Sequence, residues 1–70
     1  MYTMVSTVQE ISEAIGESPD DMALDKKVFD GDFNAKIRAR LNAVGKDAID
    51  VSINWFASRI TQRINELRDC

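Results

Sequence analysis

The stretch "IDVSINWFASRITQRINEL", residues 49–67, decides the fold expected of this 70-residue chain. Its apolar side chains recur every three or four residues, the spacing that places them on one face of an α-helix. They are Ile49, Ile53, Phe56, Ile60, Ile64 and Leu67. With Asp47 as the N-cap, the pattern predicts a helix over residues 48–68, which would span roughly 30 Å and is long for so small a chain.

The only tryptophan of the chain, Trp55, does not lie on that face. At about 100° per residue, it lies roughly 200° around the helix from Ile53, beside Val51 one turn earlier. Two explanations are open. The helix is central and the other helices bury Trp55, or Val51 and Trp55 are exposed and bind another molecule, because tryptophan is enriched among interface anchors.

The first shorter helix is marked by residues that cap helix ends. A capping box begins at Ser6 or at Thr7, and either register is consistent with the sequence. Gly16 supplies a residue that adopts a left-handed backbone and ends a helix. Together these signals predict a helix over residues 7–15.

The second helix begins at "SPDD", residues 18–21. Ser18 can cap free backbone N–H groups, and Pro19 fits the first helical position. The two aspartates place negative charge against the positive end of the helix dipole. This start predicts a helix over residues 19–29, before Gly31 interrupts the pattern.

The third helix is predicted over residues 33–44, where Phe33, Ile37, Leu41 and Val44 are spaced to share one face. The sequence leaves open whether it is separate from the second helix or continuous with it, because a single glycine costs a helix only about 1 kcal/mol.

These segments predict an all-α fold, a small bundle of three to four helices in a single domain over residues 1–70. The helices are expected at about 7–15, 19–29, 33–44 and 48–68, the last one long and C-terminal. No stretch alternates convincingly between apolar and polar residues at period two, so no sheet is expected.

Composition narrows the function classes. The chain is 44% hydrophobic and 30% charged, with one cysteine and no histidine. That composition is typical of a globular domain and excludes catalysis by histidine, a Cys/His zinc site and an internal disulfide. We expect no cofactor. We also expect a partner to contribute to stability, because the core of so small a chain is not reinforced by a disulfide or a zinc ion. No apolar run is long enough to span a membrane and no secretory signal is visible, so a cytoplasmic setting is expected.

Two motifs bear on ligand binding, and neither is complete. "DGDFN", residues 30–34, matches the first three ligand positions of a calcium-binding loop. Ala35 stands where the turn needs glycine, and Leu41 stands where a bidentate glutamate is required, so no metal site is expected. No phosphate-binding glycine loop is present either.

The segment "TVQEISEAIGESPDDMALDKKV", residues 7–28, resembles the start of a DNA-binding helix-turn-helix. It departs from that pattern at Glu17, and the second helix begins with acids that phosphates would repel. A basic group formed by Lys36, Arg38 and Arg40 is the better candidate for nucleic-acid binding. The competing interpretation is a solvated helix face.

The expected function is a non-enzymatic helical interaction protein, an assembly subunit or a regulator or inhibitor of a larger protein, of the kind that phages and mobile elements encode. Its partner would be a protein, as a homo-oligomer or a larger hetero-complex, with Val51 and Trp55 as apolar anchors and Arg59 and Arg63 as a polar rim. The alternative is a small helix-turn-helix-like transcriptional regulator that binds DNA.

Overall fold

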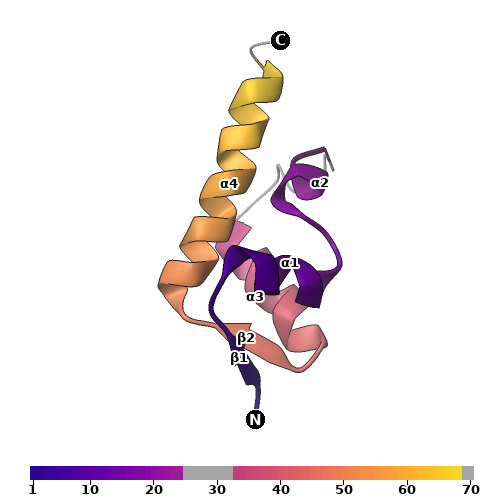
Figure 1. Ribbon diagram of the computed structural model, residues 1–70, viewed down its shortest axis with the longest axis vertical. Coiled ribbons are helices and arrows are strands. Elements are labelled where there is room, and N and C mark those ends of the chain that lie inside the picture. Colours follow the sequence, from indigo (N-terminus) through magenta and orange to yellow (C-terminus); the bar gives the residue numbers. More distant parts are fainter. Residues whose placement is uncertain (25–32, 69–70) are drawn as a thin grey trace.

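The computed structural model describes residues 1–24 and 33–68, and the statements that follow concern these residues. The chain is mostly helical, with a long C-terminal helix along the long axis of an elongated molecule of 42 × 19 × 18 Å (Figure 1). The all-α prediction is therefore confirmed. In chain order the elements are β1 (Thr3–Val5), α1 (Val8–Ile15), α2 (Pro19–Leu24), α3 (Phe33–Ala43), β2 (Lys46–Ala48) and α4 (Asp50–Arg68).

Helix α1 begins and ends at the residues that can cap it. The side chain of Thr7 accepts a hydrogen bond from the backbone N–H of Glu10 at 3.0 Å, which selects Thr7 over Ser6 as the N-cap. At the other end Gly16 has a φ of +85°, and its N–H donates to the carbonyl of Ser12. The predicted first helix is confirmed, because its boundaries depend on local backbone chemistry.

Helix α2 also begins as predicted. Ser18 accepts from the N–H of Asp21 at 3.1 Å, and the Asp21 carboxylate accepts from the N–H of Ser18 at 3.4 Å. Pro19 occupies the first helical position. The predicted continuation to residue 29, and whether the second and third helices are continuous, lie outside the described residues.

Helix α3 forms within one residue of its predicted end. Ile37 and Leu41 are fully buried, and Phe33 packs against the core as a partly buried side chain. Val44 was predicted on the same face but is 52% exposed, because the helix ends before it and Gly45 then turns the chain with a φ of +75°.

The expectation that no sheet forms was wrong. Strands β1 and β2 pair in parallel, with Thr3 opposite Lys46 and Val5 opposite Ala48 (Figure 1). Each strand has only three residues, too few to show an alternating pattern in the sequence. Their pairing is also non-local, so only the tertiary structure brings them together.

Strand β2 displaces the predicted start of the last helix. Helix α4 begins at Asp50, whereas residue 48 and an Asp47 cap were predicted. The N–H groups of Ser52 and Ile53 both donate to the carbonyl of Ile49, which places Ile49 just before the helix. Ile49 is consequently 55% exposed and does not belong to the buried face of α4.

The core forms on one face of α4. Helices α1, α2 and α3 all contact α4. In the core, Ile53, Phe56 and Ile60 are at most 1% exposed, as their spacing predicts. The core residues from the other elements are Val5, Ile11, Met22, Ala23, Ile37, Leu41 and Ala48. Of the described helices, none is long and apolar enough to cross a bilayer.

Candidate protein-interaction surface

Trp55 is exposed on the monomer. Its side chain is 54% exposed and that of Val51 is 43% exposed. The interpretation in which the other helices bury Trp55 is therefore wrong, although α4 does contact all three of them. Those helices cover the face of α4 that carries Phe56 and Ile60, which leaves the opposite face of its first turns uncovered.

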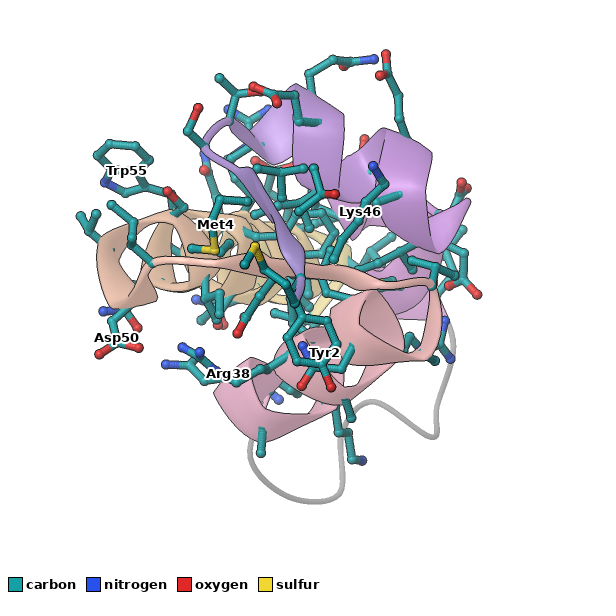
Figure 2. All side chains as sticks on the ribbon, turned by 90° about the horizontal axis from the view of Figure 1, so that it is seen from below. Tyr2, Met4, Arg38, Lys46, Asp50 and Trp55 are labelled. Atoms are coloured by element: carbon teal, nitrogen blue, oxygen red, sulfur yellow. The ribbon has the colours of Figure 1, made fainter. Side chains whose placement is uncertain are left out.

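The sheet brings further apolar side chains to the same end of the molecule. Met4 on β1 is 56% exposed, and Tyr2 just before it is 50% exposed. Figure 2 looks at this end and shows Tyr2, Met4 and Trp55 there, with Trp55 projecting away from the body of the molecule. We call this surface the apolar end and define it by Tyr2, Met4, Ile49, Val51 and Trp55.

The apolar end concentrates exposed apolar surface. Among the described residues, eight large apolar side chains are exposed, and six of them lie in residues 1–4 and 49–55. These segments are far apart in the sequence and meet because β1 pairs with β2. Sequence reasoning missed Tyr2 and Met4, since neither belongs to a periodic pattern, and assigned Ile49 to the buried face.

A buried hydrogen bond holds the start of α4 against the end of β1. Ser52 is 1% exposed, and its hydroxyl donates to the carbonyl oxygen of Ser6 at 3.0 Å. Ser52 lies between Val51 and Trp55 in the sequence, so this contact also positions the two predicted anchors relative to the strand. No signal in the sequence identifies Ser52 as a core residue.

The charged side chains beside the apolar end are paired, with two carboxylates sharing one guanidinium. The Arg38 guanidinium lies 3.2 Å from the carboxylate of Asp47 and also pairs with Asp50. Arg38 comes from α3, Asp47 from β2 and Asp50 from the first turn of α4. The ion pairs therefore link α3, β2 and the first turn of α4, and they give the carboxylate of Asp50 a partner.

The two arginines predicted as a polar rim lie further along α4. Arg59 and Arg63 line a polar pocket of about 180 Å³ together with Asp20, Gln62 and Glu66, where α2 meets α4. Arg63 pairs with Glu66 at 3.1 Å, one turn further along the same helix. Arg59 makes no ion pair with any residue that the structure describes.

The basic group on α3 is largely engaged within the molecule. Arg38 is paired as above, and Arg40 lies 2.7 Å from the carboxylate of Glu17. Lys36 is half-buried on the same helix. The two arginines of the predicted alternative nucleic-acid site thus link α3 to other parts of the chain, and phosphate binding by them would compete with these ion pairs.

The described residues contain no cluster of three or more potential metal-binding side chains. Most of the partial calcium motif lies outside the described residues, but Asn34 lies within them. Its side-chain amide donates to the side-chain oxygen of Asn54 at 2.6 Å, which links the start of α3 to α4.

Comparison with known proteins gives no relative from which a function can be transferred. No protein-family model, no curated protein and no solved structure matches this chain.

Proposed function

We propose that this protein is a non-enzymatic, cytoplasmic interaction protein that binds another protein surface through the apolar end, with Trp55 and Val51 as anchors. The observation that carries the proposal is the 54% exposure of Trp55 at the start of a helix whose other face forms the core. Large exposed apolar patches on small proteins typically mark interaction sites. Both an assembly subunit and a regulator of a larger protein would use such a surface.

The energy available at Trp55 is sufficient for an anchor. A fully buried aromatic side chain removes about 150–250 Å² from water, at roughly 25 cal/mol per Å². Covering the exposed half of Trp55 would therefore contribute about 2–3 kcal/mol, within the range of interface residues that dominate binding energy.

Rigidity of the support favours the same role. Trp55 lies on a 19-residue helix between the buried residues Ile53 and Phe56, and Ser52 bonds to the chain after β1. An anchor held in this way loses little conformational entropy on binding, which increases the net affinity that its burial provides.

DNA binding has weaker support. Arg38 and Arg40 are paired with carboxylates, and Asp20 and Asp21 stand at the start of the helix that would enter the major groove. These acids would oppose approach to phosphates. DNA binding is therefore the alternative that the experiments below test.

Photocrosslinking in cells tests the proposal. A benzophenone amino acid replaces Trp55 in one variant and the exposed Ala39 of α3 in a matched control. Protein adducts are expected from position 55 and not from position 39, and a second substitution, Val51→Asp, should reduce them. Equal yields at the two positions would contradict the proposal, provided that both variants keep the helical circular dichroism of the natural chain.

The DNA alternative is tested by titrating the purified protein with a DNA duplex at several salt concentrations. We expect no binding that weakens steeply with salt. Binding with a steep salt dependence that is lost in Arg38→Gln/Arg40→Gln would identify a phosphate-binding surface and favour the alternative.

A further inference from the structure

We propose that the partner at the apolar end is a second copy of this chain, joined by antiparallel pairing of the free edge of β1 with β1 of the other copy. This inference rests on the proposed function, because it names the protein that the apolar end binds.

The outer edge of β1 is available for pairing. The N–H of Thr3 donates to the carbonyl of Gly45 at 3.0 Å, so the backbone groups of Thr3 face β2. Residues along a strand alternate in the side toward which their N–H and C=O point, and those of Met4 therefore face away from β2. No other described strand adjoins β1 on that side, and Met4 is 56% exposed.

The free edge is complementary to itself. An antiparallel pair centred on Met4 places Met4 opposite Met4 of the second copy, where each N–H donates to the carbonyl of the other residue. A two-fold axis through this pair gives the closed symmetry of most small homodimers. The product is a four-stranded sheet in the order β2-β1-β1-β2, and sheets of three or more strands are more stable than an isolated pair.

The same pairing would cover the anchors. The carbonyl of Ser6, the residue after β1, accepts the hydroxyl of Ser52. The start of α4 thus lies beside the C-terminal end of β1. Pairing centred on Met4 places Tyr2 of the second copy opposite Ser6, next to the turn that carries Val51 and Trp55.

Electrostatics favours a second copy over a charged partner. A two-fold interface brings the same surface of both copies together, so an unneutralised charge near the axis would repel the same charge on the second copy. Residues 1–5 carry no charged side chain, and Asp50 at the start of α4 is paired with Arg38. Arg38 also pairs with Asp47, so the two carboxylates share one guanidinium. Residues 1–5 and 49–55 contain no basic side chain that would attract a polyanion.

The surface needed is compatible with the size of the molecule. A standard interface covers about 800 Å² of each partner. The accessible surface of this chain is 4574 Å², so the dimer would cover about a sixth of it. The two segments that would be covered hold six of the eight exposed large apolar side chains among the described residues.

Light scattering on the purified protein tests the inference with one matched pair of variants. Met4→Pro removes the N–H at the free edge. It should keep the pairing with β2, because the bonds to β2 come from the neighbours Thr3 and Val5. Proline is tolerated where a strand N–H faces solvent. Met4→Leu keeps the N–H. We expect twice the chain mass of 7.9 kDa for the natural protein and Met4→Leu, and the monomer mass for Met4→Pro with unchanged helical circular dichroism.

A disulfide experiment checks the register if Met4→Pro impairs folding. Hydrogen-bonded antiparallel residues have Cα atoms about 5.5 Å apart, a separation that a disulfide spans. In a Cys70→Ser background, Met4→Cys should oxidise to a covalent dimer, whereas Ala39→Cys should not.

Four results would overturn the inference, and only the last of them also contradicts the proposed function. A natural chain that is monomeric at about 1 mM excludes the second copy. A dimer that survives Met4→Pro and is lost in Trp55→Ala excludes strand pairing but keeps the anchor. Crosslinks from position 55 only to other proteins exclude the homodimer and keep the interaction function. A monomer with no crosslinks at position 55 contradicts both proposals.

Discussion

The hydroxyl of Ser52 on α4 donates to the carbonyl oxygen of Ser6, which follows β1, across a separation of 46 residues. Ser52 is the only buried polar side chain in the part of the chain that the structure describes. The bond joins the two segments that form the apolar end, so the geometry of the candidate interaction surface depends on it.

Loss of this bond should destabilise the fold modestly. Ser52→Ala removes the donor and leaves the Ser6 carbonyl with one partner fewer, and we expect the free energy of unfolding to fall by about 0.5–1.5 kcal/mol. Urea denaturation followed by circular dichroism measures the change. Ser58→Ala, at an exposed position of the same helix, is the control and should be neutral or slightly stabilising. Equal effects of the two substitutions would show that the buried bond contributes nothing.

The neighbours Trp55 and Phe56 should differ sharply in their effects on stability. Phe56 is fully buried, so Phe56→Ala should lower the free energy of unfolding by about 3–5 kcal/mol. Trp55→Ala should cost about 1 kcal/mol or less, because only half of the side chain is covered and alanine favours the helix. Thermal or urea unfolding at a concentration where both variants are monomeric measures the difference. A larger loss at Trp55 would mean that its face belongs to the core.

The choice of N-cap in α1 can be measured directly. Thr7→Ala removes the acceptor for the Glu10 N–H, and we expect a loss of about 0.5–2 kcal/mol in the free energy of unfolding. Ser6 makes only a 3.4 Å side-chain contact with the Glu10 carboxylate, so Ser6→Ala should be nearly neutral. A larger loss of stability in Ser6→Ala than in Thr7→Ala would place the N-cap at Ser6.

Backbone conformation at Gly16 predicts an effect that depends on the substituted residue. Its φ of +85° disfavours a Cβ, although no atom within 4 Å would clash with one. Gly16→Ala should lower the free energy of unfolding by about 1–2 kcal/mol, and Gly16→Asn by less, because asparagine adopts the left-handed region more readily. Calorimetry of the two variants tests this order, and equal losses would point to a cause other than backbone strain.

The ion pairs of Arg38 should contribute little to stability. The Arg38 and Asp50 side chains are 39% and 91% exposed, so water and salt screen their interaction. Arg38→Gln should therefore cost less than about 1 kcal/mol, and the loss should shrink when unfolding is repeated at high salt. A cost that is larger and independent of salt would indicate that Arg38 contributes through packing of its aliphatic portion.

Sequence reasoning succeeded where the controlling interactions are local. The boundaries at Thr7, Gly16, Ser18 and Pro19 depend on groups within four residues of one another. The buried face of α4 was read from spacing alone, and Ile53, Phe56 and Ile60 are in the core as predicted.

The errors fall where distant segments meet. Strand β1 and strand β2 are each three residues long, and neither carries a pattern that predicts its partner. Because residues 46–48 form β2, α4 begins at Asp50 and not at the predicted residue 48, and Ile49 is exposed. The same pairing added Met4 to the candidate site, and no single segment of the sequence could have indicated it.

By itself, the sequence determined a helical chain with a long C-terminal helix, and it placed Val51 and Trp55 on the side opposite the main apolar face, because helical periodicity orients each side chain relative to its neighbours. Only the tertiary structure decided that α1, α2 and α3 cover the same side of α4 and leave Trp55 exposed. It also decided that β1 and β2 bring Met4 to the end of the molecule that carries Trp55. The physical reason is that side-chain burial depends on contacts between residues distant in sequence, which periodicity does not encode.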